Sequence, residues 1–152
     1  MLSVLLTLSL PGVALAQRQL HWDRLNVEAR LDAAGSLHVT ETHAMVFTGA
    51  WNGGERKFNI RPQQRLTFTR ISRLSGPGPR DLHEDRSLLN VDDYAWTDAR
   101  TLRWRSRLST DPPFAGTAIT YALEYQLSGI LVKDGDRYVL DHDFALGAAS
   151  SR

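Results

Sequence analysis

The segment Thr117–Leu127, with the sequence TAITYALEYQL, decides the fold of this chain. Its large apolar side chains recur at every second position, at Ile119, Tyr121, Leu123, Tyr125 and Leu127. Successive side chains of a β-strand point to opposite faces, so a period of two places this set on one face. The segment therefore predicts a long strand with one buried face.

The same period appears in two segments near the N-terminus. Leu25–Leu31 and Ser36–Phe47 both alternate apolar with polar side chains. Between them, Asp32-Ala33-Ala34-Gly35 supplies a turn, because aspartate favours turns and glycine accepts a positive φ. The two segments predict a β-hairpin.

Shorter segments predict the remaining strands. These strands contain Phe58 and Ile60, Leu66 to Ile71 or Leu74, Leu102 and Trp104, and Tyr138 to Phe144. A glycine-rich loop is expected at Thr48–Gly54, and Lys133-Asp134-Gly135-Asp136 contains the Asp-Gly pair that favours a tight type I′ hairpin. Arg80–Thr101 is acidic and keeps no clear period, with one turn of helix expected at Asp92–Trp96.

Short strands separated by turns, with little helix, are typical of an all-β fold. We expect an antiparallel, immunoglobulin-like β-sandwich of about seven or eight strands, and a β-barrel is the alternative. Burial of one large apolar side chain contributes roughly 1.5–3 kcal/mol. The centre of the core is expected at Val27, Val39, Phe58, Ile119 and Leu123.

The N-terminus has the pattern of a secretory signal peptide. Leu2–Leu10 is an uncharged apolar run, and Val13-Ala14-Leu15-Ala16 places alanine at both small-residue positions of a cleavage site. The run is too short to span a membrane, which takes roughly 20 apolar residues. Residues 1–16 are therefore expected to be a signal peptide, 17–146 a β-sandwich domain and 147–152 a disordered tail; a buried N-terminal strand is the alternative to export.

Composition limits the classes of partner and site. The formal net charge is +1 and the basic residues are scattered, so the sequence predicts no nucleic-acid partner. The absence of cysteine excludes disulfides, zinc thiolate sites and thiol catalysis. No second segment approaches the length of a membrane span, so we expect no spanning helix in this chain.

Two blocks of sequence resemble a bacterial family. The first block is Leu25–Leu31 followed by Ala34–Thr42 (AGSLHVTET) and Gly53–Ile60 (GGERKFNI), and the second is Gly116–Tyr125 (GTAITYALEY) followed by Gly129. From Leu20 to Phe144 the chain is similar to the predicted membrane proteins with domain of unknown function 2207. The resemblance implies a signal peptide, an extracytoplasmic β-domain, and membrane helices that tether it, with no established activity.

The chain departs from that pattern at both ends. No Lys or Arg follows Met1 before the apolar run. After Leu146 the sequence continues as Gly147–Arg152, where the resemblance implies further strands and a membrane anchor. We therefore expect a truncated copy of a protein whose intact form is associated with a membrane.

Two groups of residues have side chains used in metal binding or acid–base catalysis. Asp141-His142-Asp143 contains metal-ligand types, but neighbours on a strand face opposite ways and His142 falls on an apolar face, so we expect no metal there. Glu41 and His43 lie two apart on one face and have the groups for acid–base catalysis. We favour a structural role, with Glu41 near a sheet margin and paired with Arg56 or with His43.

The glycine-rich loop contains a candidate ligand site. Trp51 and Asn52 lie there among three glycines, and an exposed aromatic side chain on a loop commonly binds a sugar or a protein. The alternative is that Trp51 folds back as a lid over one end of the sandwich. Trp104, in contrast, is expected in the core.

No motif of the sequence signals an enzyme. The G-x-S-x-G elbow and the glycine patterns of phosphate-binding loops are missing, and we predict no catalytic residue, metal or cofactor. We expect a non-enzymatic, extracytoplasmic module of the bacterial envelope for interaction or sensing, whose partner is an envelope protein or a polysaccharide. A carbohydrate-binding module is one alternative, and a metal-dependent envelope hydrolase built around Glu41 and His43 or Asp141 and Asp143 is another.

Overall fold

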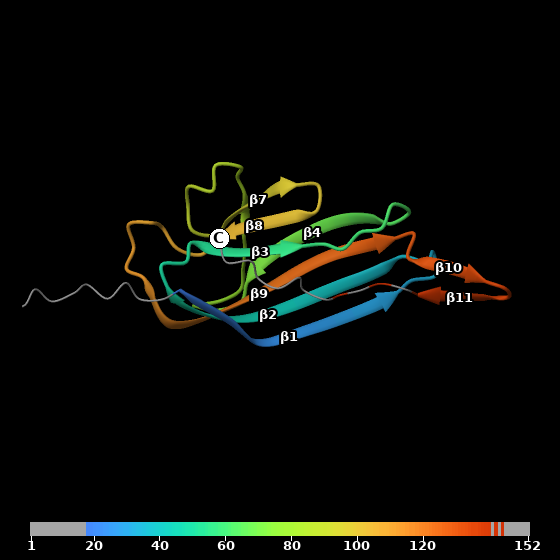
Figure 1. The fold of residues 1–152 in the computed structure, drawn as a ribbon, viewed down its shortest axis with the longest axis horizontal. Helices are drawn as coiled ribbons and strands as arrows, with labels where there is room; N and C mark the ends of the chain where they lie inside the picture. Colours follow the sequence, from blue (N-terminus) through green and yellow to red (C-terminus); the bar gives the residue numbers. More distant parts are fainter. Residues whose placement is uncertain (1–17, 141, 143, 145–152) are drawn as a thin grey trace, which may run out of the picture.

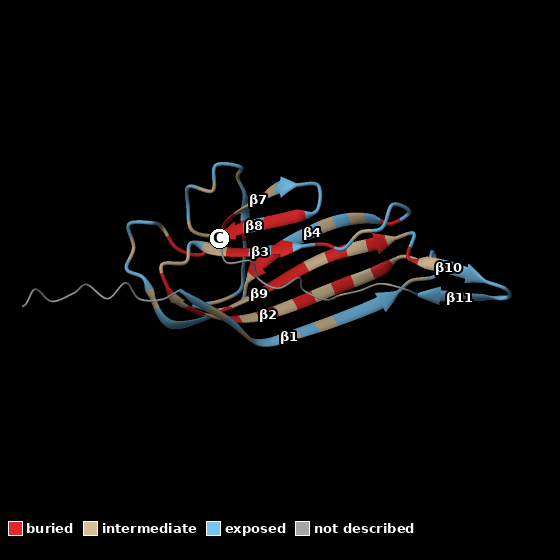
Figure 2. Ribbon diagram, in the orientation of Figure 1, coloured by how far each residue is buried: buried red, intermediate tan, exposed pale blue. Residues whose placement is uncertain are grey.

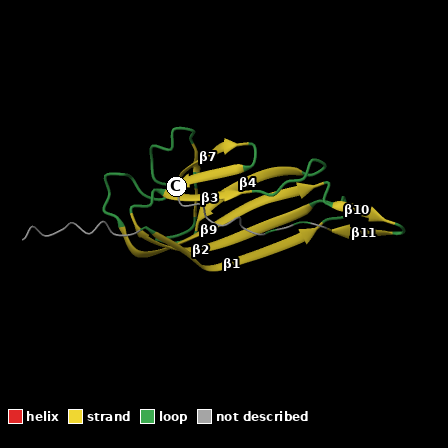
Figure 3. Cartoon of the chain, in the orientation of Figure 1, coloured by secondary structure: helices red, strands yellow, loops and turns green. Residues whose placement is uncertain are grey.

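The described part of the chain is all-β. The computed structural model describes residues 18–140, 142 and 144 (Figure 1). Over these residues it contains strands, turns and loops but no helix (Figure 3), and hence no helix that could cross a membrane. The strands are β1 (Gln19–Leu31), β2 (Leu37–Gly49), β3 (Gly53–Lys57), β4 (Arg65–Arg73), β5 (Arg80–Asp81), β6 (His83–Glu84), β7 (Asp93–Asp98), β8 (Thr101–Arg105), β9 (Phe114–Ser128), β10 (Leu131–Asp134) and β11 (Arg137–Leu140).

Two sheets pack face to face around one core (Figure 1). The larger sheet has the strand order β1-β2-β9-β4-β5 and the smaller sheet β3-β8-β7-β6, while β10 and β11 form a separate hairpin. Among the described strands, neighbours run antiparallel except in the short pair β6 and β7. The expected all-β, antiparallel sandwich is confirmed, and its immunoglobulin-like character stays a prediction.

Strands β2 and β9 form the centre of the larger sheet. β2 alternates between buried and half-buried positions along most of its length, and β9 buries the alternating set predicted from Thr117–Leu127 (Figure 2). Met45 lies opposite Ile119, and Leu37 lies opposite Leu127. Because residues directly opposite each other share a face, the buried sets of the two strands form one continuous inner surface.

The core draws on both sheets. Its buried apolar members are Leu37, Val39, Met45, Phe47, Phe58, Ile71, Leu82, Leu102, Trp104, Ile119, Tyr121, Leu123, Tyr125, Leu127 and Ile130. This confirms the core positions expected at Val39, Phe58, Ile119 and Leu123, and the buried position expected for Trp104. Val27 is only partly buried, because β1 is the outermost strand of its sheet.

The predicted hairpin near the N-terminus is β1 and β2. The carboxylate of Asp32 accepts hydrogen bonds from the backbone N–H groups of Ala34 (3.0 Å) and Ser36 (2.9 Å). Gly35 has a φ of +80°, a value that L-residues with a Cβ rarely adopt. The Asp and Gly of the turn therefore set the register that places Val39 and Met45 inside.

The glycine-rich loop is shorter than expected, because its last two glycines are part of a strand. β3 begins at Gly53, whereas the expected strand around Phe58 and Ile60 is wrong: both residues follow the strand. β3 pairs with β8 so closely that a Cβ at Gly53 would overlap the carbonyl oxygen of Trp104. Glycine here permits close approach of two strands, although glycine pairs usually signal a loop.

The acidic middle segment contains strands rather than the expected turn of helix. β7 covers the predicted helical turn, and Tyr94 and Trp96 lie opposite Trp104 and Leu102 of β8. Aromatic side chains suit a pleated, half-buried surface, and the acidic residues around them hide this alternation in the sequence. With the two-residue strands β5 and β6 and the pair β10 and β11, the described residues form eleven strands, where we expected seven or eight.

The β10–β11 hairpin extends beyond the end of the sandwich (Figure 1). Asp134 pairs with Arg137, so the expected tight hairpin is present, but its two central residues are Gly135 and Asp136. The expected type I′ turn is wrong, because that turn needs a positive φ at both central residues and only Gly135 (+59°) has one. No sheet of the described residues covers the hairpin, and Tyr138 is 68% exposed instead of lying on a buried apolar face. The signal peptide expected at 1–16 and the tail expected at 147–152 lie outside the described residues.

Candidate functional site

A buried network of charged groups joins the two sheets. The Glu41 carboxylate on β2 accepts hydrogen bonds from Arg56 on β3, at 2.8 Å from Nε and 2.6 Å from Nη2. It also accepts hydrogen bonds from His43 Nε2 (2.8 Å) and from the Tyr125 hydroxyl on β9 (2.6 Å). Arg56 is the member that belongs to the smaller sheet, so the ion pair crosses the core.

The strand period brings these side chains together. Glu41 and His43 follow Val39 on the inner face of β2, and Arg56 lies on the inner face of β3 between two exposed residues. The Arg56 guanidinium lies 5.0 Å from the centre of the Phe58 ring, and its Nη1 donates to the carbonyl of Lys57. Packing over an aromatic ring adds a favourable cation–π contact.

The network keeps Glu41 ionised. Burial by itself raises the pKa of the Glu41 carboxyl, but the hydrogen bonds from Arg56 and His43 and the charge of Arg56 outweigh it and bring the pKa down to about 2. Burial by itself lowers the pKa of Arg56, but the hydrogen bonds to Glu41 and the charge of Glu41 outweigh it and raise that pKa. Burial and the nearby Glu41 charge raise the pKa of Tyr125, so its hydroxyl keeps its proton and donates a hydrogen bond to the carboxylate.

His43 is held in one tautomer. A carboxylate only accepts hydrogen bonds, so Nε2 must be the nitrogen that donates to Glu41. Nδ1 is buried without a hydrogen-bond partner in the described part of the chain, and the ring packs against Trp22 with centroids 4.8 Å apart.

The network has the groups of an acid–base pair but no room for a substrate. The four hydrogen bonds from His43, Arg56 and Tyr125 fill the usual capacity of the Glu41 carboxylate. Glu41 and His43 are both 0% exposed. The expected pairing with Arg56 or His43 is confirmed for both partners, but the expected position at a sheet margin is wrong, because β2 lies between β1 and β9.

This network makes stability depend on pH in the acid range. The folded-state pKa of Glu41 is lower than its ordinary value of 4.5, so its contribution is complete above pH 4.5 and is lost as the pH falls towards 2. We expect the chain to lose about 3 kcal/mol of unfolding free energy through this group over that range. Urea unfolding of the chain and of Glu41→Gln at several pH values measures it: the stability gap between the two should narrow towards pH 2, and a constant gap would contradict the assignment.

Trp51 and Asn52 lie in the short loop between β2 and β3. The Trp51 indole N–H donates to the carbonyl of Gln19 (3.0 Å), and the Trp51 carbonyl accepts from Arg107 Nε (2.9 Å). The Asn52 carbonyl accepts from the backbone N–H of Ser106 (2.7 Å), while its side chain is exposed. These contacts agree with the lid alternative for Trp51, and ligand binding by the pair stays a prediction.

The expected group at the C-terminal end is described only in part. His142 is half-buried, with its ring 4.7 Å from that of Phe144, which agrees with the expected packing role. Asp141 and Asp143 lie outside the described residues.

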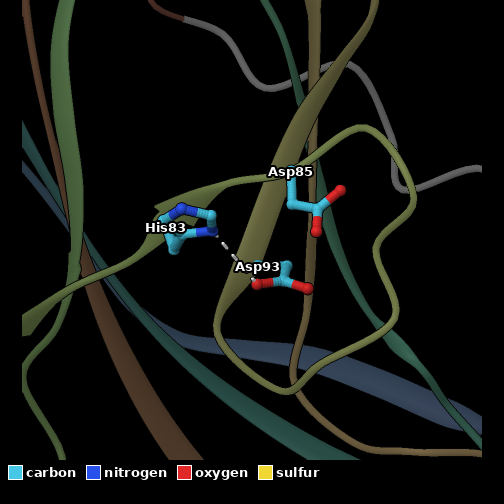
Figure 4. A group of neighbouring side chains, drawn as sticks. All are labelled: His83, Asp85 and Asp93. Atoms are coloured by element: carbon cyan, nitrogen blue, oxygen red, sulfur yellow. Dashed lines mark ion pairs between the residues drawn. The ribbon is translucent and has the colours of Figure 1, made fainter.

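A second group of titratable side chains, which the sequence did not predict, consists of one exposed, one half-buried and one buried residue. His83 at β6, Asp85 just after it and Asp93 at the start of β7 point toward one another, with one ligand atom from each within 4.8 Å of the other two (Figure 4). The sequence could have indicated only His83 and Asp85, whose spacing of two places them on one side of an extended segment. Asp93 could be added only when the pairing of β6 with β7 was known.

The larger sheet also has a shallow groove of about 460 Å³ on its outer face. Polar side chains line most of it, including Glu28, Arg30, His38, Thr40 and Glu124.

Comparison of the chain with models of protein families, with curated proteins and with solved structures finds no match.

Proposed function

We propose that this chain is a non-enzymatic interaction module of the bacterial envelope, and that it binds an extended segment of another envelope protein along the edge of β1. One observation carries the proposal. β1 is 13 residues long and pairs with β2 on one side, while no described strand pairs with its other side. Such an edge presents a row of unpaired backbone N–H and C=O groups, to which an extended peptide adds as a further strand.

The part of this edge suited to strand addition is Arg24–Leu31. A bulge between Trp22 and Arg24 interrupts the register before it, and a bulge bends its strand. After the bulge the inner face of β1 presents Leu25 and Val27, both half-buried, and Leu31, which is 45% exposed. An added strand would cover these apolar side chains, which no neighbour covers on that side in the described structure.

The outer face of the same stretch favours a partner of particular charge. Arg24, Glu28 and Arg30 lie opposite Ala44, Thr40 and His38 of β2 and point away from the core. Opposite charges on neighbouring strands attract and like charges repel. The partner segment is therefore one with acidic residues opposite the two arginines and a basic residue opposite Glu28.

The remaining parts of the proposal are the lack of catalysis and the placement outside the cytoplasm. The acid–base pair of Glu41 and His43 is buried, and its carboxylate is already fully hydrogen-bonded. Placement outside the cytoplasm rests on the signal-peptide pattern of residues 1–16, and a tether in the intact form rests on the resemblance to the predicted membrane family.

Site-specific photo-crosslinking in the native cells tests this function. The photoreactive residue p-benzoylphenylalanine replaces Asn26 or Glu28 on β1, and Arg103 on the smaller sheet serves as a control, since all three are exposed. We expect adducts with a specific envelope protein from the two β1 positions, in chains that lack residues 1–16, and none from Arg103.

The other outcomes would overturn the proposal. Adducts of two copies of this chain would indicate self-association, and polysaccharide adducts would indicate the carbohydrate-binding alternative. Equal adducts from Asn26 and Arg103 would show that the edge of β1 has no special role. A chain that keeps residues 1–16 in the cytoplasm would contradict export.

A further inference from the structure

The group formed by His83, Asp85 and Asp93 is assembled by backbone pairing. His83 lies directly beside Asp93 in the parallel pair of β6 and β7. The N–H of Asp85 donates to the carbonyl of Tyr94 (2.9 Å), which holds Asp85 against β7 as well. Three side chains from both ends of one loop therefore converge (Figure 4).

The distances in this group leave space between the polar atoms. His83 Nδ1 and Asp93 Oδ1 are 3.7 Å apart, which is longer than a hydrogen bond. One ligand atom from each of the three residues lies within 4.8 Å of the other two. One imidazole nitrogen with two carboxylate oxygens is a ligand set that zinc accepts, with a further position for water.

The Asp93 carboxylate has no arginine or lysine partner among the described residues. Its side chain is 5% exposed, and the hydrogen bond it receives, from the N–H of Asn90 (2.7 Å), goes to Oδ2. Within the described residues, Oδ1 receives no hydrogen bond and the carboxylate has no Arg or Lys partner. A buried charge is costly unless it is paired, and His83, whose side chain is 79% exposed, is a weak partner.

The neighbouring Asp92 shows the difference. It forms ion pairs with Arg73 (3.2 Å) and with Arg80, so its charge is compensated by two guanidinium groups. Asp93 instead has its Oδ1 3.7 Å from His83 Nδ1, and one of its carboxylate oxygens belongs to the group that includes Asp85. Asp93 is thus deeply buried without an arginine partner, and it is also the residue that lies beside two other side chains of metal-ligand type.

Asp85 is hydrogen-bonded through one of its two carboxylate oxygens. The hydroxyl (2.7 Å) and the N–H (2.8 Å) of Ser87 both donate to Oδ1. Its Oδ2 receives no hydrogen bond from the described residues.

We propose that His83, Asp85 and Asp93 bind a divalent transition-metal ion, with Zn²⁺ as the best fit to one nitrogen and two oxygen ligands. The ion compensates the buried charge of Asp93 and joins both ends of the loop between β6 and β7. The position left open by the three side chains faces solvent, because His83 is exposed. This site is independent of strand addition at β1.

Titration of the tag-free chain with ZnCl₂ tests the site by calorimetry and by thermal unfolding. We expect one ion per chain and a higher midpoint of unfolding with Zn²⁺. Loss of residues that merely support metal ligands weakens metal binding by about 10–100-fold, so His83→Ala and Asp85→Asn should each weaken it by at least about tenfold. His21→Ala, which removes an exposed histidine on β1, is the control and should leave the affinity unchanged.

Each result of the ZnCl₂ titration either supports or overturns the metal site. Binding that His83→Ala and Asp85→Asn both weaken supports the site, even if Asp93→Asn fails to fold. Unchanged affinity in His83→Ala, loss of binding in His21→Ala, or no heat and no stabilisation with ZnCl₂ would each overturn it.

Discussion

We expect Arg56→Met to lower the free energy of unfolding by about 3–5 kcal/mol. Methionine keeps an apolar stem over Phe58 but removes the two hydrogen bonds to Glu41. The Glu41 carboxylate, 1% exposed, would then be a buried charge without its cation. Chemical unfolding followed by far-ultraviolet circular dichroism measures the loss, which is a large share of the usual 5–15 kcal/mol of a domain.

Two matched variants make this expectation specific. Arg103→Met breaks the pair of Arg103 with Glu55 (2.7 Å), where the side chains are 55% and 39% exposed, and should cost no more than about 1 kcal/mol. Glu41→Gln combined with Arg56→Met removes both charges, so the double variant should be more stable than Arg56→Met alone. If Arg56→Met costs no more than Arg103→Met, the buried network does not have the role assigned to it.

The second large effect is expected for Gly53→Ala, which should cost at least about 3 kcal/mol, the upper end of typical overpacking costs. A Cβ at this position would overlap the carbonyl of Trp104 and come within 3.0 Å of the Cα of Arg105. These are backbone atoms of the paired strand, so a side-chain rotation cannot relieve the overlap. β3 would have to separate from β8, and thermal unfolding would report the loss.

The position of the damage provides a further check on Gly53→Ala. Hydrogen exchange should become faster at the amides of β3 and β8 before it does so in β2 and β9. Gly78→Ala is the control, because a Cβ there meets no atom within 4 Å and the φ is not positive, so we expect a change within about 0.5 kcal/mol. Equal effects of the two substitutions would show that the close approach of β3 and β8 is not required.

Part of the buried network could be predicted from alternation alone. A period of two places Glu41 and His43 on the inner face of their strand, and a buried carboxylate requires a cation, which pointed to Arg56. Tyr125 was predicted only as an apolar residue of its face, because nothing in the sequence states which buried polar groups will meet. The prediction that Glu41 lies near a sheet margin was wrong, because it assumed that a charged group avoids the centre of a sandwich.

The glycine-rich segment and the acidic segment show the same limit. Glycine pairs were interpreted as a loop, although Gly53 and Gly54 belong to a strand that passes close to Trp104. The acidic segment contains β7, whose apolar side chains are too few to show a period of two in the sequence. In both cases the deciding contact comes from another strand, so the local pattern does not contain it.

The sequence by itself determined the all-β class, the long central strands, the hairpin at Asp32–Gly35 and the inner face that contains Glu41. These features follow from local rules: side-chain alternation along a strand and the φ preferences of turn residues. Only the tertiary structure decided that Arg56 reaches Glu41 from the opposite sheet, and that His83 and Asp93 lie side by side. Such meetings depend on how strands pair and sheets pack over long sequence separations, and burial then sets the strength of each charge interaction.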